Sequence, residues 1–281
     1  MGGVVDGPQG GMADGAAVEL VAPAKLTVSL RVTGVRPDGY HLLTAEMVTL
    51  DLVDTVVVGP GDHGRFEVES DWPGGAAGWR DLDVGGHDDN LVTRALAAVG
   101  RTPDVRLVKR IPPGAGLGGG SADAAAVLRW AGCTDPKVAA RLGADVPFCL
   151  HGGRALVSGI GEELEPLSFE PRSYVLVLPP FGVDTAAVYR AWDALDAAGQ
   201  LSPGGTTNDL EAAAVAVEPR LVGWKQAFED ATGRPAHLAG SGSTWFVEGD
   251  PADLAIDISA GLTYDGQRAP LVATRATPGV G

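Results

Sequence analysis

Alternating apolar and polar residues near the start of the chain predict β-strands. Val18–Val21 and Leu26–Val32 alternate and are rich in β-branched residues, so together they predict a strand pair. The Pro-Asp-Gly sequence within Arg36–Gly39 is typical of a turn. The next segment, His41–Leu52, is expected to be helical or extended, and Thr55–Val58 is again β-rich. The first ordered part of the chain is therefore expected to be largely β-structure.

Further along, strand and helix patterns are interleaved, and Gly59–Gly86 is expected to be a variable loop or hairpin. The expected strands lie near Phe66–Val68 and at Val105–Ile111, Arg154–Ser158, Tyr174–Leu178, His237–Leu238, Thr244–Val247 and Leu271–Arg275. The expected helices are Asp89–Val99, Ala122–Trp130, Pro136–Leu142, Thr185–Ala198, Asn208–Ala216, Pro219–Ala231 and Pro251–Ala260. Gly143–Leu150 is expected to be a tight turn that leads into a buried segment. This order lacks regular βαβ spacing and predicts an α+β fold.

The length of 281 residues suits one large domain or two ordinary ones. We expect an N-terminal domain at 18–165, which ends after the Gly159-Ile-Gly161 turn, and a C-terminal domain at 166–281. Residues 1–17 are rich in glycine and lack the basic and apolar regions of a signal peptide. They are expected to be a disordered leader.

Charge and cysteine content narrow the possible partners. The 21 Lys and Arg residues against 36 Asp and Glu residues give a net charge of −15, which argues against a general binder of nucleic acids or anionic membranes. No apolar run approaches the ~20 residues that cross a bilayer. Cys133 and Cys149 make no disulfide framework and cannot alone close a zinc site. We therefore expect a cytoplasmic protein with no nucleic-acid or membrane partner, although a local basic pocket stays possible.

The most informative passage is the glycine-rich segment Gly114–Ser121. Five of its first seven residues are glycine, and it lies between a predicted strand and a predicted helix. Glycines let backbone amides approach a ligand closely, and a helix N-terminus adds positive potential there. A flexible linker seldom occupies such a position. The segment therefore predicts a phosphate-binding loop.

Several phosphate-binding and catalytic classes can be tested against this loop. Gly114, Gly116 and Gly119 match the dinucleotide fingerprint and Asp135 lies where a ribose-binding acid is expected, but so glycine-rich a loop contains that pattern by chance. A Walker A loop is excluded because no Lys-Ser or Lys-Thr follows the glycines. Protein kinases and serine hydrolases are excluded because their His-Arg-Asp, Asp-Phe-Gly and Gly-x-Ser-x-Gly motifs do not occur. Because the dinucleotide fingerprint is formally present, an NAD-binding oxidoreductase is kept as an alternative.

Three other segments carry candidate chemistry, and each also has an ordinary structural reading. Lys25 interrupts an apolar strand, where its ammonium needs a carboxylate or a ligand, unless it reaches the surface. Asp145 lies between Gly-Ala and Val-Pro-Phe, so it is either a part-buried carboxylate paired with a cation or a turn and N-cap residue. Ala239–Ser243 is a glycine-serine turn that offers backbone donors or simply closes a hairpin.

Taken in order, these motifs resemble the GHMP family of small-molecule kinases. The order is Pro-x-Lys-x-Thr at 23–27, the glycine loop that starts at Pro112, Gly-Ala-Asp-Val-Pro-Phe at 143–148 and Gly-Ser-Gly-Ser-Thr at 240–244. Asp38-Gly-Tyr-His41 is similar to the signature of the branch that phosphorylates a cytidine-diphosphate-linked methylerythritol. Segments 89–92, 109–112 and 208–210 are also similar to that branch. The resemblance runs from about residue 20 to about residue 250.

This resemblance implies an α+β kinase of two domains. The N-terminal, ATP-binding domain would resemble ribosomal protein S5 domain 2, the C-terminal domain would be ferredoxin-like, and the substrate would lie between them. ATP, with Mg²⁺, would donate its γ-phosphoryl group to the 2-hydroxyl of the cytidine-diphosphate-linked methylerythritol. The reaction belongs to the non-mevalonate route of isoprenoid precursor biosynthesis.

The resemblance also implies roles for individual residues. Lys25 and Asp145 would be the catalytic pair. Tyr40 and His41 would hold the cytidine, and Tyr189 would be a second stacking aromatic. The other implied roles are Asn90 and Lys109 near the adenine, Ser121 as a Mg²⁺ ligand, Thr27 as a substrate contact, and a phosphate loop made of Pro112, Pro113, Gly114, Ala115, Gly116, Leu117, Gly118, Gly119, Gly120, Ser121 and Ala122.

Two positions depart from the family pattern, and three alternative functions stay open. Thr27 replaces a frequent Asn, so weaker substrate hydrogen bonding is expected, and Asp184 stands where a small residue is expected. The chain is alternatively a GHMP kinase for mevalonate, homoserine or a sugar, against which the Tyr40-His41 pair argues. It is otherwise a nucleotide-binding regulator without transfer activity, or the oxidoreductase named above.

Overall fold

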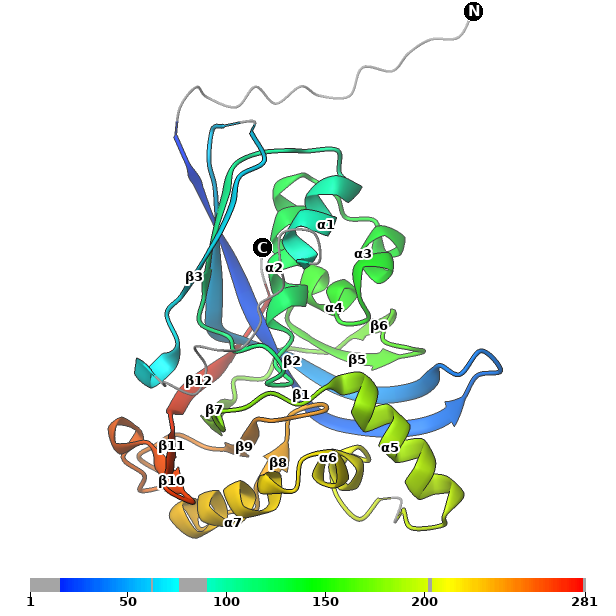
Figure 1. The fold of residues 1–281 in the computed structure, drawn as a ribbon, viewed down its shortest axis with the longest axis vertical. Coiled ribbons are helices and arrows are strands. Elements are labelled where there is room, and N and C mark those ends of the chain that lie inside the picture. The colour runs from blue at the N-terminus through cyan, green and yellow to red at the C-terminus, as the bar shows by residue number, and fades with distance from the viewer. Residues whose placement is uncertain (1–15, 62, 76–89, 202–203, 280–281) are drawn as a thin grey trace, which may run out of the picture.

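The computed structural model describes residues 16–61, 63–75, 90–201 and 204–279 (Figure 1). Most of the expected leader, at 1–15, lies outside the described residues, and so do residues 62 and 76–86 of the expected variable loop and Asp89, the expected start of the next helix. Within the described ranges the chain is a mixed α+β structure, so the predicted fold class is confirmed.

Two long strands, β1 (Val18–Val35) and β2 (His41–Val58), are the backbone of the molecule. They pair antiparallel from end to end, with register irregularities on β1 next to Pro23, Thr27 and Val32. The predicted short strands at 18–21, 26–32 and 55–58 are therefore wrong in their boundaries, and of the two states predicted for 41–52 the extended one is observed. Pro23 lacks an N–H and breaks the apolar pattern, but the irregular register lets the strand continue past it.

The N-terminal half combines a sheet with four helices. Besides β1 and β2, its sheet has β3 (Phe66–Ser70), β4 (Val105–Lys109), β5 (Arg154–Ser158) and β6 (Glu163–Pro166). A 3₁₀ turn, η1 (Pro73–Gly75), follows β3, and the helices are α1 (Leu91–Ala98), α2 (Gly119–Trp130), α3 (Pro136–Leu142) and α4 (Val146–His151). Strands β4 and β5 both pair with β2, and the helices form one layer against the sheet (Figure 1).

Two of these helices differ from the prediction. Helix α2 begins at Gly119, three residues earlier than expected, so the last glycines of the loop belong to its first turn. Helix α4 occupies most of the segment expected to be a turn. Pro147 does not prevent this helix because it lies in the first turn, where a missing N–H costs no helical hydrogen bond.

The C-terminal half extends the same sheet with strands β7 (Ser173–Val177), β8 (His237–Leu238), β9 (Trp245–Glu248) and β12 (Leu271–Thr277). Its helices are α5 (Thr185–Ala197), α6 (Glu211–Val217) and α7 (Arg220–Thr232). The predicted helix at 251–260 is wrong: turns there lead to a short 3₁₀ helix, η3 (Ile258–Ala260), and a small hairpin, β10 (Leu262–Tyr264) with β11 (Gln267–Ala269).

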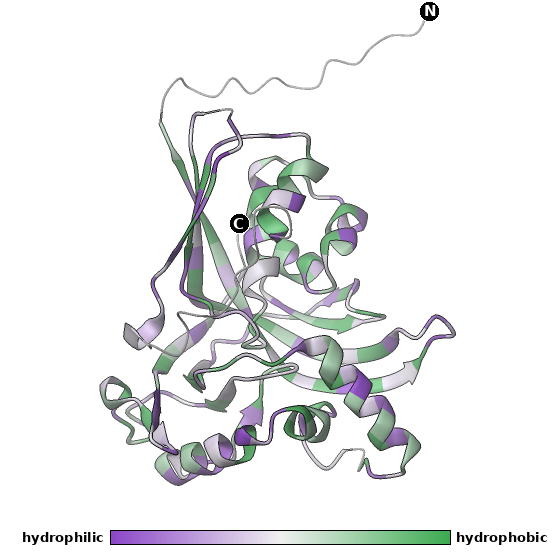
Figure 2. Cartoon of the chain, in the orientation of Figure 1, coloured by the Kyte–Doolittle hydropathy of each residue, from purple (hydrophilic) through white to green (hydrophobic). Residues whose placement is uncertain are grey.

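Strand β12 joins the two halves. It pairs antiparallel with β7, and its last residues pair with Leu50 and Thr49 of β2. A buried apolar cluster lies at this junction and contains Leu26, Leu50, Leu176 and Phe246, together with Leu117 of the glycine loop. Apolar residues predominate in the central strands and in the α1–α2 layer (Figure 2). The loop is therefore anchored in the core at the point where the halves meet.

None of the helices in the described ranges has the length and apolar character of a membrane span.

Candidate active site

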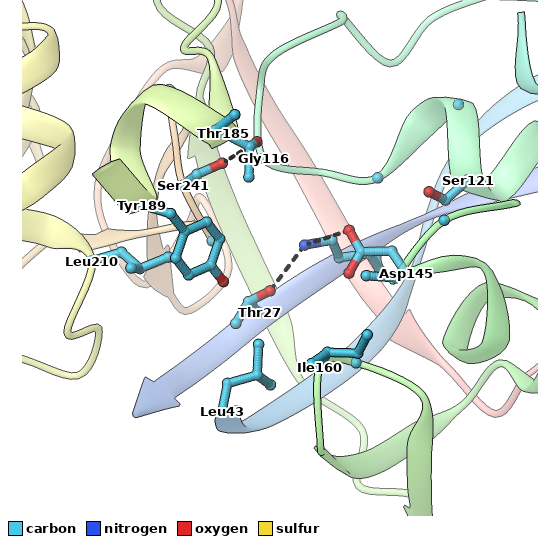
Figure 3. Close-up of a pocket in the computed structure, with 18 of the residues that line it drawn as sticks. Thr27, Leu43, Gly116, Ser121, Asp145, Ile160, Thr185, Tyr189, Leu210 and Ser241 are labelled. Atoms are coloured by element: carbon cyan, nitrogen blue, oxygen red, sulfur yellow. Dashed lines mark hydrogen bonds and ion pairs between the residues drawn. The ribbon is translucent and has the colours of Figure 1, made fainter. Parts of the chain in front are cut away.

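A cavity of about 1000 Å³ lies between the two halves (Figure 3). Its lining includes the catalytic and substrate-binding candidates together with the glycine loop from Pro112 to Ser121. The candidates are Lys25, Thr27, Tyr40, His41, Asp145 and Tyr189. Helix α5 and the turn at Gly240 and Ser241 line it from the C-terminal half. Residues predicted from six separate segments of the sequence thus share one site.

Lys25 and Asp145 form an ion pair at this cavity. Lys25 Nζ lies 3.4 Å from Asp145 Oδ2 and donates a hydrogen bond to Thr27 Oγ1 at 3.1 Å (Figure 3). The lysine is only 5% exposed, so it does not reach the surface. Asp145 occupies the N-cap position of α4, but its side chain makes no capping hydrogen bond. Its carboxylate therefore faces the lysine and the cavity, and is not used to hold the helix.

The carbonyl groups of the glycine loop are hydrogen-bonded to the surrounding structure. The bonds, at 2.9–3.2 Å, run from the N–H groups of Val183 and Ser243 to Gly114 O, from Thr244 N–H to Ala115 O and from Lys25 N–H to Leu117 O. Because these oxygens are held by neighbouring strands and turns, the loop is rigid rather than a linker. Its amides and the N-terminus of α2 then provide a site suited to phosphate.

Glycine is required at two positions of this loop by close contacts. A Cβ at Gly116, where φ is +77°, would overlap the carbonyl oxygen of Ala239. A Cβ at Gly118, where φ is +67°, would lie 2.8 Å from Lys25 Cγ. The loop therefore packs directly against the catalytic lysine and against the glycine-serine turn, and any side chain there would push them apart.

The other end of the cavity is aromatic. His41 is packed against Tyr189, with ring centroids 4.7 Å apart, and against the edge of Trp192 at 5.4 Å. Its Nε2–H donates to Asp193 Oδ1 at 2.7 Å, since a carboxylate only accepts hydrogen bonds. Burial, with the nearby Asp145 carboxylate, raises the pKa of Tyr189 to about 12, so this phenol stays neutral. Tyr40 is exposed at the rim, where the Arg36 guanidinium lies 5.8 Å from the centre of its ring.

Comparison with known proteins finds kinases, in agreement with this site geometry. The profile of the GHMP kinases N terminal domain matches residues 90–153. The 4-diphosphocytidyl-2-C-methyl-D-erythritol kinase of Paracoccus denitrificans (strain Pd 1222) is 40% identical over 242 residues, which cover 80% of this chain and 84% of that protein. The kinase of the same name from Pelotomaculum thermopropionicum is 37% identical, and the match covers 92% of this chain and 93% of that protein. The chain belongs to the 4-diphosphocytidyl-2-C-methyl-D-erythritol kinase family.

Solved structures support the same family. A crystal structure of 4-(cytidine 5'-diphospho)-2C-methyl-D-erythritol kinase aligns with a TM-score of 0.63 and 32% identity, and covers 92% of this chain and 100% of that one. A crystal structure of L. major mevalonate kinase in complex with R-mevalonate aligns with a TM-score of 0.59 at 12% identity. The alignment covers 94% of this chain and 97% of that one, and shows a shared fold alone. The expected two-domain GHMP kinase fold is therefore confirmed.

Asn90 and Lys109 do not line the cavity as far as the structure describes it. Asn90 Oδ1 accepts a hydrogen bond from Val92 N–H at 2.9 Å and so caps α1. Lys109 Nζ lies behind the loop, where it contacts the carboxylates of Asp54 and Asp123. The adenine contacts that the family resemblance implies for Asn90 and Lys109 stay predictions.

Some polar residues of the cavity were missed by sequence reasoning. They are Arg141, Glu162, Thr185, Arg190 and Asp193, whereas Ser241 belongs to the glycine-serine turn that the sequence singles out. Thr185 Oγ1 and Ser241 Oγ are hydrogen-bonded at 2.8 Å, which links α5 to the glycine-serine turn (Figure 3). The unexpected Asp184 has a local role, because its Oδ1 accepts from Ala187 N–H at 2.6 Å and caps α5. A polar residue just before an apolar helix is the signal that predicts such a cap.

We expect the stability of this kinase to depend on the protonation of Asp123. Burial raises the pKa of Asp123 from 3.8 to about 7, against the opposing effect of Lys109. Between these two pH values the folded chain holds a proton that the unfolded chain has released. The free energy of unfolding should therefore fall as pH rises through this window and level off above it.

Urea unfolding at pH 5 and pH 8 measures this effect. Asp123→Asn should lose less stability between the two pH values than the wild type, and Asp230→Asn, an exposed aspartate of α7, should behave as the wild type. Equal losses in Asp123→Asn and the wild type would contradict the assignment.

Proposed function

We propose that this chain transfers the γ-phosphoryl group of ATP to the 2-hydroxyl of 4-diphosphocytidyl-2-C-methyl-D-erythritol, a step of isoprenoid precursor biosynthesis. The observation that carries the proposal is the Lys25–Asp145 ion pair, which shares one cavity with the glycine loop and with the His41–Tyr189 aromatic pair. The names of the curated relatives support the same substrate. A phosphate loop, an acid–base pair and a flat aromatic surface are what this reaction needs.

Asp145 would act as the general base. Its carboxylate accepts the proton of the 2-hydroxyl while the substrate oxygen forms its bond to the γ-phosphorus. The bond between that phosphorus and the β,γ-bridging oxygen breaks, and its electron pair leaves with ADP. Proton acceptance by a positioned carboxylate contributes ~10²–10⁴-fold to such rates. Lys25, 3.4 Å away, stabilises the negative charge on the carboxylate and on the transferred group.

Thr27 orients the catalytic lysine. Its Oγ1 accepts a hydrogen bond from Lys25 Nζ, and its side chain is buried at the cavity wall. The hydroxyl group of Thr27 can then donate a hydrogen bond to the substrate, at the position where the family often has an amide side chain. This is the contact in which we expect altered substrate hydrogen bonding.

Mg²⁺ fits the oxygen donors at the phosphate end of the cavity. Ser121 lines the cavity at the start of α2, and a Cβ on Gly143 would lie 3.9 Å from its Oγ, close to the Asp145 segment. A hydroxyl together with phosphate oxygens is a donor set that Mg²⁺ prefers. Ser121 is thus the residue that would hold the ion, which when bound neutralises phosphate charge.

We also propose that the chain divides near residue 165 into domains at 18–165 and 166–281 and acts in the cytoplasm without nucleic-acid or membrane partners. The position of the cavity between the halves supports the division, although β12 returns to pair with β2. The net charge of −15 and the free thiols of Cys133 and Cys149 support the rest.

A coupled ADP-release assay with Mg²⁺ and ATP tests the proposal. Turnover of the cytidyl substrate, with none of mevalonate or homoserine, is the expected result. Turnover of another alcohol instead would reject the cytidine pocket and keep the Lys25–Asp145 pair. ATP binding without turnover of any of the three would favour the nucleotide-binding regulator.

We expect His41→Ala to raise the KM for the cytidyl substrate about tenfold and to change kcat much less. Stacking of His41 on the base is similar in the ground state and the transition state, so its loss weakens the binding of both states equally. Steady-state kinetics with each substrate varied in turn give the two constants, and the KM for ATP is the internal control. A defect confined to kcat would contradict the role of His41 in holding cytidine.

A further inference from the structure

Three charged side chains are buried behind the glycine loop, outside the cavity. Asp54 of β2, Lys109 of β4 and Asp123 of α2 are 0, 4 and 2% exposed. Lys109 Nζ contacts both carboxylates, at 2.6 Å in the case of Asp123. We refer to Asp54, Lys109 and Asp123 as the acid–lysine cluster. The mechanism above uses none of them.

The cluster holds the residues that lead into the loop. Asp54 Oδ1 accepts hydrogen bonds from Arg110 N–H at 2.5 Å and from Ile111 N–H at 2.8 Å. Ile111 directly precedes Pro112, the first residue of the loop. The other carboxylate oxygen of Asp54, Oδ2, accepts a hydrogen bond from Lys109 Nζ. One buried carboxylate therefore fixes the backbone at the start of the loop.

The cluster also holds the end of the loop. Lys109 Nζ donates to Oδ2 of Asp123, in the early part of α2, while Oδ1 of Asp123 is buried and has no hydrogen-bond partner among the described residues. A Cβ on Gly119 would lie 3.1 Å from Lys109 Nζ and 2.9 Å from Ile111 Cγ2. The ammonium thus lies directly against the first turn of α2, whose position depends on Lys109.

Burying two carboxylates and one ammonium is costly, and apolar residues of similar shape often stabilise a fold as well or better. We propose that the acid–lysine cluster is a positioning device that clamps both ends of the phosphate loop, and so sets the affinity of the loop for the phosphates of the nucleotide. The proposal rests on the proposed function, in which this loop binds ATP. Asp123 acts through the loop and not on the substrates, and the Lys109 ammonium, paired with both carboxylates, links the two ends of the loop.

The expected consequence is selective for the nucleotide. Amides of a loop bind phosphate only when several point at it together, and displacements of about 1 Å cost up to about 100-fold. The cytidine end of the cavity lies apart from the cluster, on α5 and at the start of β2, where His41 is 13 residues away from Asp54 in the sequence. Loosening the cluster should therefore weaken the binding of ATP and ADP and leave the binding of a cytidine nucleotide almost unaffected.

Asp123→Asn tests the clamp in the full-length chain, with Asp230→Asn of α7 as the matched control. We expect Asp123→Asn to raise the KM for ATP and the calorimetric Kd for ADP about tenfold. The Kd for CDP and the KM for the cytidyl substrate should stay within about twofold. A lower melting temperature with unchanged nucleotide affinity would show a merely structural role and overturn the proposal.

A triple substitution, Asp54→Asn with Lys109→Met and Asp123→Leu, covers the case in which the single variant does not fold. Lys109 pairs with both carboxylates, so only the removal of all three charges leaves no unpaired charge in the cluster, and the triple variant should fold where the single one fails. It should show the same selective loss of ADP over CDP, whereas equal affinity to wild type for both would overturn the proposal. Absence of ADP binding by the wild type would instead reject the proposed function itself, and the clamp with it.

Discussion

Replacing Asp145 by Asn is expected to lower kcat by about 10²–10⁴-fold. The amide has the shape of the carboxylate but cannot accept the proton of the substrate hydroxyl. Lys25 keeps its hydrogen bond to Thr27 in this variant, so the cavity should hold its form. Asp145 provides no cap to α4, so folding should also be little affected. Steady-state turnover and the Kd for ADP, measured side by side, separate the two effects.

The affinity for ADP is the control for Asp145→Asn and should stay within about threefold of wild type, because the loop and not Asp145 holds the phosphates. Asp230→Asn should retain full turnover. Wild-type kcat in Asp145→Asn would show that the proton leaves by another route. An equal loss of ADP binding and turnover would place Asp145 in nucleotide binding instead.

Much of the fold could be predicted from local pattern. Pro136–Leu142 and Arg154–Ser158 have the predicted boundaries, because a proline at a helix start and a short alternating strand are local signals. The long strands β1 and β2 could not be bounded, since their continuity depends on pairing with each other across Pro23. The segment at 251–260 is rich in helix formers, but it folds as turns between β9 and a small hairpin.

The site shows the same division between local and long-range information. The glycine loop and the charged residues Lys25 and Asp145 stand out in the sequence, each in an apolar context. The acid–lysine cluster has the same signal, since Asp54, Lys109 and Asp123 all interrupt apolar segments. What the sequence cannot show is which charge pairs with which: 55 residues separate Lys109 from Asp54 and 14 separate it from Asp123.

The second large effect is expected for Gly116→Ala, which should remove ATP binding and destabilise the fold. The added methyl group would overlap the Ala239 carbonyl oxygen, in a backbone conformation with φ of +77° that alanine rarely adopts. The loop cannot retreat, because its carbonyls at 114, 115 and 117 are tied to neighbouring segments. We expect the free energy of unfolding to fall by about 2–4 kcal/mol and the Kd for ADP to rise at least about 100-fold.

Gly120→Ala is the matched control for Gly116→Ala within the same segment. Among the described residues its Cβ would meet only Leu91 Cδ1, at 3.5 Å, which is an ordinary contact. Gly120 lies in the first turn of α2, where alanine is favourable. Urea unfolding should therefore place Gly120→Ala within about 0.5 kcal/mol of wild type. If Gly116→Ala unfolded like Gly120→Ala and bound ADP as the wild type does, the close packing of loop and glycine-serine turn would not be what shapes the phosphate site.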